Sequence, residues 1–219
     1  ELRNPTVELP FDVAQVLLGV DAVLLTHTHL DHWDVAAQSM IPKQMPMFVQ
    51  HEADAALLRE QGFHDVRILP AHETFGGVKI SRIGAQHGSA AMFAVEPLAA
   101  LLGSVMGFVF EKEGEPTLYL AGDTVWTGDV QQAIKDHAPE VIVLNTGDAR
   151  VKGFDTGIIM GTEDTSRVHA LAPAAKIVAV HMDAVNHMTV SRADLHRYVT
   201  EKSIQDSVLI PEDGETLNF

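Results

Sequence analysis

The chain has 219 residues, of which 46% are hydrophobic, so it is long enough to bury the core of one large domain, and we expect residues 1–219 to form a single one. Thirty acidic residues against fifteen Lys and Arg give a formal net charge of −15, which repels polyanions and disfavours loose binding to nucleic acid. The chain has no cysteine, which excludes disulfides and thiolate ligands, so a metal ion would have to be held by His and Asp.

No segment is typical of a membrane protein. The longest charge-free apolar stretch near the middle runs from Pro97 to Phe110 and is shorter than the roughly 18 to 20 residues that cross a bilayer. No signal peptide is visible at the start. We therefore expect no membrane association, with the cytoplasm as the default compartment. A small-molecule substrate is the expected partner, and assembly into a homo-oligomer stays open.

The first 21 residues predict little regular structure. Residues 1–11 carry two prolines and no clear periodicity, and a short helix is expected from Asp12 to Leu18. The apolar run Ala22 to Leu25 then has the length and the Val and Leu content of a buried strand. Because the first residue is Glu1 rather than methionine, we expect the encoded protein to be longer.

Three histidines and one aspartate follow this strand within six positions, at His27, His29, Asp31 and His32. In an extended segment alternate side chains share a face, so His27 and His29 point the same way. If the chain turns into a helix directly afterwards, Asp31 and His32 return toward the same cavity but displaced, where they can serve a second ion. The spacing therefore predicts two metal ions, and the alternative is a solvated, histidine-rich strand end.

Helices and strands alternate along the rest of the chain, which predicts a mixed α/β layered fold. Strands are expected at 47–50, 66–69, 78–83, 105–110, 117–120, 141–144 and 176–180, helices at 34–40, 52–61, 129–137, 162–171 and 191–202, and a hairpin around Asp213 and Gly214 within 208–219. The segment Ser89 to Gly103 is rich in Ala, Met and Leu and predicts a short helix over 98–102. It is either ordinary core packing or a lid or wall of a substrate site.

Three of the later strands end in a residue that binds metals in many proteins, namely His87, Asp123 and His181. A binding site at one edge of a sheet needs several strands to release ligands on the same side. Taken alone, His87 can equally be a loop histidine and Asp123 a turn former. His187 lies six residues beyond His181 and is expected near the cavity, either as a catalytic group or as a packing residue. The remaining histidines predict surface or capping positions: His51, His64, His72, His137, His169 and His196.

The segment Thr26-His27-Thr28-His29-Leu30-Asp31-His32 resembles the His-x-His-x-Asp-His signature of the metallo-β-lactamase-fold hydrolases. The later candidates follow it in the family's order, so the resemblance extends to the C-terminus. It implies a four-layer αβ/βα sandwich, and because the family's signature usually follows an opening hairpin and a third strand, we expect those opening strands to be missing from this sequence. It also implies two metal sites, with ligands His27, His29 and His87 for one ion, Asp31, His32 and His181 for the other, and Asp123 as the bridge.

Such a site implies hydrolytic chemistry. Zn²⁺ suits these ligands best, although Mn²⁺ or Fe²⁺ occupies similar sites, and two such ions share a water and lower its pKa until hydroxide, the nucleophile, exists near neutrality. We expect Asp31 and His187 to be the catalytic groups. The net acidity of the chain and the apolar segment after His87 favour a small ester, lactone or amide as the substrate, as in a lactonase-like enzyme.

Three other interpretations stay open. The first is a phosphodiesterase or nuclease of the same fold, since a fold does not choose its substrate. The second is a di-iron redox protein, although relatives of that kind usually carry an additional carboxylate and a flavin domain, and neither is found here. The third is a metal-binding scaffold without activity, against which the complete set of ligands argues.

Overall fold

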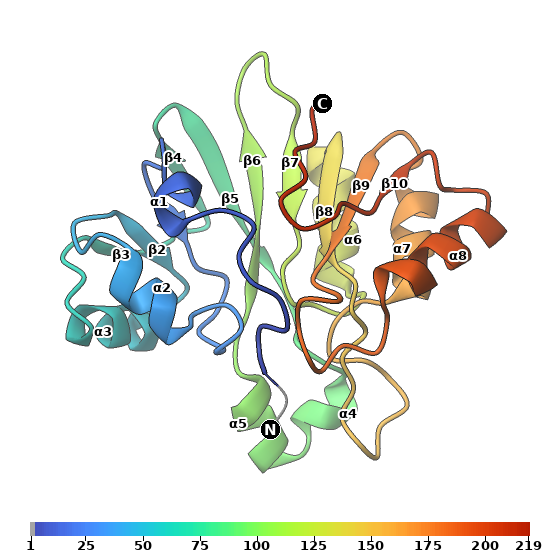
Figure 1. Ribbon diagram of the computed structural model, residues 1–219, viewed down its shortest axis with the longest axis horizontal. Coiled ribbons are helices and arrows are strands. Elements are labelled where there is room, and N and C mark those ends of the chain that lie inside the picture. Colours follow the sequence, from blue (N-terminus) through green and yellow to red (C-terminus); the bar gives the residue numbers. More distant parts are fainter. Residues whose placement is uncertain (1–2) are drawn as a thin grey trace.

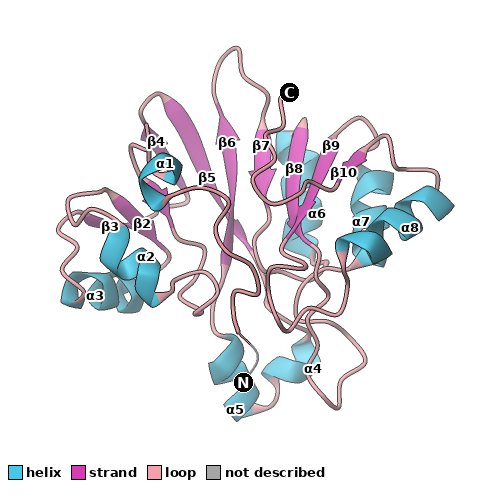
Figure 2. Cartoon of the chain, in the orientation of Figure 1, coloured by secondary structure: helices cyan, strands magenta, loops and turns pink. Residues whose placement is uncertain are grey.

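The computed structural model describes residues 3–219, in which helices and strands alternate along most of the chain (Figures 1 and 2). The strands are β1 (Val23–Leu24), β2 (Met47–Val49), β3 (Val66–Ile68), β4 (His72–Phe75), β5 (Val78–Gly84), β6 (Met106–Glu111), β7 (Leu118–Leu120), β8 (Val141–Asn145), β9 (Lys176–Val180) and β10 (Val208–Leu209). The helices are α1 (Val13–Val16), α2 (Val35–Met40), α3 (Glu52–Glu60), α4 (Ala90–Phe93), α5 (Glu96–Leu102), α6 (Gly128–His137), α7 (Thr162–Leu171) and α8 (Arg192–Glu201).

Within residues 3–219 the strands form two sheets. The smaller sheet has the order β1-β2-β3, and its strands are parallel. The larger sheet has the order β10-β9-β8-β7-β6-β5-β4. Its strands from β10 to β7 are parallel, whereas β6, β5 and β4 pair antiparallel. The parallel strands are joined through helices, as such connections require.

The alternating side chains of β2 show how the layers are built. Met47 and Val49 point away from the larger sheet and pack with Leu58 of α3, whereas Phe48 points toward the larger sheet and lies in a cluster with Phe108 of β6. On the far face of the larger sheet, buried side chains of α6, α7 and α8 pack against β7 to β10. The order helix, sheet, sheet, helix confirms the predicted αβ/βα sandwich (Figure 1).

The hairpin predicted for residues 208–219 is wrong. Val208 and Leu209 form a short strand that pairs parallel with β9, and no strand follows within the described C-terminal segment. Pro211 has no backbone N–H and so cannot donate to a ladder at this point. The N–H of Glu212 instead donates to the carboxylate of Glu215, which closes a local turn.

A different hairpin lies earlier in the chain, where only the second strand was predicted. β4 and β5 pair antiparallel across Gly76 and Gly77, whose φ values of 57° and 79° suit the tight turn of a two-residue hairpin. β4 is a polar strand at the edge of the sheet, so it lacks the apolar alternation by which strands are recognised. Among the described residues, no helix has the length and apolar character needed to cross a bilayer.

Candidate metal centre

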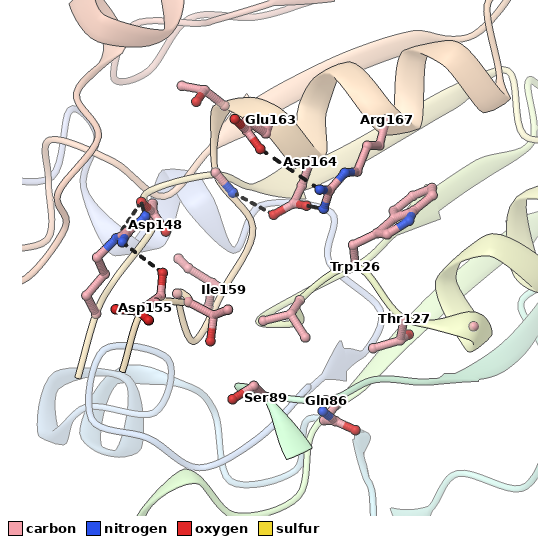
Figure 3. A pocket seen from close by; sticks show the side chains of 17 residues that line it. Gln86, Ser89, Trp126, Thr127, Asp148, Asp155, Ile159, Glu163, Asp164 and Arg167 are labelled. Carbon is pink, nitrogen blue, oxygen red and sulfur yellow. Dashed lines mark hydrogen bonds and ion pairs between the residues drawn. The ribbon is translucent and has the colours of Figure 1, made fainter. Parts of the chain in front are cut away.

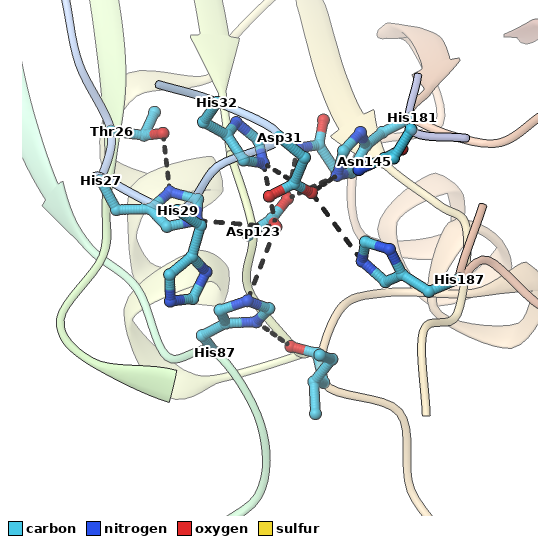
Figure 4. Close-up of polar contacts among 12 residues, drawn as sticks. Thr26, His27, His29, Asp31, His32, His87, Asp123, Asn145, His181 and His187 are labelled. Atoms are coloured by element: carbon cyan, nitrogen blue, oxygen red, sulfur yellow. Dashed lines mark hydrogen bonds and ion pairs between the residues drawn. The ribbon is translucent and has the colours of Figure 1, made fainter. Parts of the chain in front are cut away.

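The seven predicted ligands come together at one edge of the sheets, although they derive from four separate segments (Figure 4). They form two groups, and within each group one candidate ligand atom per residue lies within 4.8 Å of the others. The first group is His27, His29 and His87, and the second is Asp31, His32, Asp123 and His181. Each segment enters the site directly after a strand, namely β1, β5, β7 or β9.

Asp123 lies between the two groups. Its Oδ2 is 3.1 Å from Nε2 of His32 in the second group, and 3.8 Å and 3.7 Å from the Nε2 atoms of His27 and His87 in the first. Its Oδ1 accepts a hydrogen bond from Nδ2 of Asn145 at 2.6 Å, in the buried interior. One carboxylate oxygen therefore faces both groups while the other is held in place. This is the position that a bridging ligand requires.

Two buried nitrogen atoms in the site lack a hydrogen-bond partner among the described residues. They are Nε2 of His27 and Nε2 of His181, the latter in ion-pair contact with Asp31 and Asp123 at 3.5 Å but without hydrogen-bond geometry to either. A buried polar atom without a partner is costly and is rare in native proteins. A cation bound by these nitrogens would satisfy both, so the residues present fit a pair of metal ions held by imidazole and carboxylate.

Backbone carbonyls select the ring nitrogen that two of the histidines present to the site. Nδ1 of His87 lies 2.8 Å from the carbonyl oxygen of Ile158, and Nε2 of His29 lies 2.9 Å from that of Leu101. A carbonyl oxygen only accepts, so each of these nitrogens carries the proton and donates. The lone pair is therefore left on Nε2 of His87 and on Nδ1 of His29, where a metal ion can use it.

The protonation states in the site differ between the two groups. Burial, together with the neighbouring His32, lowers the pKa of His27 to about 3, and burial also lowers the pKa of His87. Burial acts in the same direction on His181, but its contacts with Asp123 and Asp31 outweigh it and raise the pKa of His181 to about 9. At neutral pH His27 and His87 are therefore uncharged and ready to bind a cation, whereas His181 carries a proton that a cation must displace.

Metal binding should therefore release protons. Protein stripped with a chelator and titrated with Zn²⁺ at pH 7 is expected to take up two equivalents and to release at least one proton, because His181 is charged below its pKa of about 9. The release should shrink as the pH rises through 9. Calorimetry in buffers of different ionisation enthalpy counts the protons, and elemental analysis counts the ions. Saturation at one ion would contradict the presence of two sites.

His187 belongs to neither group of ligands. Its Nε2 is 3.8 Å from Oδ2 of Asp31, and its side chain is 47% exposed (Figure 4). It lies on the loop after β9 and borders a cavity of about 390 Å³ in front of the histidines. This is the place near the cavity that the sequence predicts for it. The cavity is lined by Thr28, His29, Leu30, Asp31, His87, Leu101, Leu102, Val151, Ile158 and His187.

The segment Ser89 to Gly103 combines the two roles that the sequence left open. It forms α4 and α5, and Met92 and Leu102 are buried against the core. Leu101 is largely exposed, and both Leu101 and Leu102 border the cavity. The segment is thus anchored like core and also supplies one wall of the cavity.

A larger cavity of about 610 Å³ lies on the other side of the loop that follows β8 (Figure 3). Val151 and Ile158 of this loop face the smaller cavity, whereas Arg150 faces the larger one. The two arginines there are paired with acids: Arg150 with Asp148 at 2.7 Å, and Arg167 with Asp164 at 2.8 Å. None of the seven predicted ligands lines it. Three of them, His29, Asp31 and His87, line the smaller cavity, and Asp31, His32 and His181 line a further cavity of about 520 Å³.

Sequence reasoning missed the groups that hold the ligands. Asn145 ends the buried strand β8, so the rule that picked out His87 and Asp123 at strand ends could have found it. The hydroxyl of Thr26, 3.0 Å from Nδ1 of His27, lies inside the signature itself. The carbonyls of Ile158 and Leu101 carry no sequence signal, because any residue supplies the same group.

Comparisons with known proteins agree with this geometry. The sequence profile of the β-lactamase superfamily domain matches residues 2–182. The chain belongs to this superfamily. The UPF0173 protein YddR of Bacillus subtilis is 44% identical over 220 residues, which cover 100% of this chain and 84% of YddR. The prediction of a metallo-β-lactamase-fold, metal-dependent hydrolase is thereby confirmed at the level of the family and the enzyme class.

Two crystal structures of superfamily members resemble the chain over almost its whole length. One is described as a possible metal-dependent hydrolase from Veillonella parvula and has 48% sequence identity, a TM-score of 0.97, and coverage of 99% of this chain and 83% of that one. The other is an isothiocyanate hydrolase from Delia radicum gut bacteria, with 47% identity, a TM-score of 0.95, and coverage of 99% and 84%.

Proposed function

We propose that this superfamily member is a dinuclear hydrolase, with Zn²⁺ as the leading ion, that acts on small uncharged carbon electrophiles. Isothiocyanates are the first candidates, followed by the esters, lactones and amides favoured by the sequence. The observation that carries the proposal is the cavity of about 390 Å³, whose polar floor contains His29, Asp31 and His87 and whose walls are apolar. A cavity of this size suits a small molecule.

The charge of the cavity favours uncharged substrates. Among the described residues that line it there is no Lys or Arg, and Asp31 is its acidic group. A carboxylate or phosphate on the substrate would find no side-chain cation there. The likeness to an isothiocyanate hydrolase, at 47% identity over 99% of the chain, supports the same class of substrate.

The chain's own residues have separate roles in this proposal. Two bound ions would lower the pKa of a water molecule and polarise the electrophile. Asp123 holds the two ligand groups together, and Asp31 accepts a hydrogen bond from the attacking water. His187, half exposed at the cavity and 3.8 Å from Asp31, donates a proton to the leaving group. For an isothiocyanate, water adds to the central carbon, the carbon–nitrogen bond breaks, and an amine and carbonyl sulfide leave.

A panel of substrates tests this function. The metal-loaded protein should convert benzyl isothiocyanate to benzylamine, measured by the loss of the isothiocyanate absorbance and by detection of the amine. Aryl esters and lactones should be slower, and bis(p-nitrophenyl) phosphate slower still. Faster cleavage of the phosphodiester would replace the proposal with a phosphodiesterase, and no turnover of any compound would favour a scaffold without activity. Chelator-treated protein is the control.

A further inference from the structure

We propose that Leu30 and Leu101 form a recognition site for an apolar side chain, so that the substrate is an electrophile carrying an uncharged alkyl or aryl group. This inference rests on the proposed function and names the part of the substrate that lies away from the reacting carbon. The two residues come from distant parts of the chain, the signature loop and the end of α5, yet both border the same cavity.

Both leucines are largely exposed to solvent. Leu30 is 74% exposed and Leu101 is 68% exposed, so neither contributes much to the core. A single exposed leucine needs no explanation, but two at the mouth of a cavity form an apolar surface that water covers when no ligand is bound. An apolar substituent placed there would remove both from water, and this is a favourable contribution to binding.

The apolar surface continues inward to the metal ligands. Leu102 and Ile158 pack beside the backbone of Gly88, which follows the ligand His87, because a Cβ at Gly88 would lie 3.1 Å from Cδ1 of Leu102 and 3.6 Å from Cγ2 of Ile158. Both residues also line the cavity. A substrate whose reacting carbon faces His87 can therefore extend its side chain along these residues toward Leu101.

A hydrogen bond joins the two segments that carry the leucines. Nε2 of His29 donates to the carbonyl oxygen of Leu101 at 2.9 Å, and Leu30 directly follows His29. The same contact that orients His29 therefore joins the end of α5 to the signature loop, and Leu30 of that loop borders the same cavity as Leu101. The recognition surface and the metal centre share one structural support.

A series of substrates of increasing length tests the inference. The kcat/KM values for n-alkyl isothiocyanates from ethyl to hexyl are compared for the wild type, Leu101→Ser, Leu30→Ser and the double variant. A methylene that is fully removed from water favours binding by about fourfold. We expect kcat/KM of the wild type to rise about two- to fourfold per methylene, and we expect this rise to flatten in the double variant.

Leu18→Ser is the matched control, because Leu18 is 85% exposed and does not line the cavity. It should keep the wild-type dependence on chain length. Equal slopes in the wild type and the double variant would overturn the inference and leave the proposed function standing. If the isothiocyanates are not hydrolysed, the proposed function fails in its first substrate class, and calorimetric titration of the Zn²⁺-loaded proteins with alkyl hydroxamates of the same lengths still decides whether the leucines recognise the chain.

Discussion

Replacement of Asp123 by Asn should lower kcat/KM about a thousandfold or more and reduce the metal content below two equivalents, because bound ions supply several kcal/mol of catalysis. The substitution changes charge but hardly changes volume. Oδ2 of Asp123 lies 3.1 to 3.8 Å from histidine nitrogens of both ligand groups, so an amide at this position removes the negative charge that two cations would share. Metal analysis and steady-state kinetics on the same preparation measure both effects.

The control for this variant is Asp136→Asn, which alters an exposed carboxylate on α6. It should retain both metal ions and full activity. Circular dichroism and thermal unfolding of the metal-free proteins separate a loss of ligand from a loss of fold. An Asp123→Asn protein that still binds two ions and turns over substrate normally would contradict a bridging role and return Asp123 to a purely structural one.

Replacement of His187 by Ala should lower kcat about a hundredfold while both metal ions stay bound. His187 stands outside both ligand groups, but its Nε2 is 3.8 Å from Asp31 and its ring borders the cavity. Its loss removes the proton donor for the leaving group without removing a ligand.

The matched control is His196→Ala, because His196 is an exposed histidine on α8 that does not line the cavity. It should behave like the wild type. Loss of metal in His187→Ala would make His187 a ligand or a support for one, and full activity would reduce it to a packing residue. The Asp123 and His187 variants thus differ in metal content although both lose activity.

The sequence was most informative where a metal-binding side chain directly follows a predicted strand. The apolar run before His27 and the runs before His87, Asp123 and His181 predict both the strands and the edge at which their ends meet, and the structure brings all seven candidate ligands together there. The side chains of Met47, Phe48 and Val49 point alternately to the two faces of the small sheet, as expected for a strand buried on both faces. These predictions depend only on residues that are neighbours in the sequence, and the secondary structure expected from them is present in the fold.

The contacts that support the ligands could not be predicted, because their partners are distant in the sequence. His29 and Leu101 are 72 residues apart, and His87 and Ile158 are 71 apart, and in each pair the partner is a backbone carbonyl. The C-terminal hairpin failed for a different reason, since Pro211 interrupts the ladder that a turn at Asp213 and Gly214 otherwise suggests. Whether His187 acts in catalysis stays a prediction.

The hydrogen bond between His29 and the carbonyl of Leu101 links metal binding at His29 to ligand binding at the mouth of the cavity. If a ligand at the mouth of the cavity shifts the end of α5, it changes the orientation of His29 and hence the affinity for metal. By reciprocity, the metal changes the affinity for that ligand by the same factor. Bulky apolar compounds and chelators would then act on a single equilibrium, and metal loading would change the affinity of this surface for the substrate.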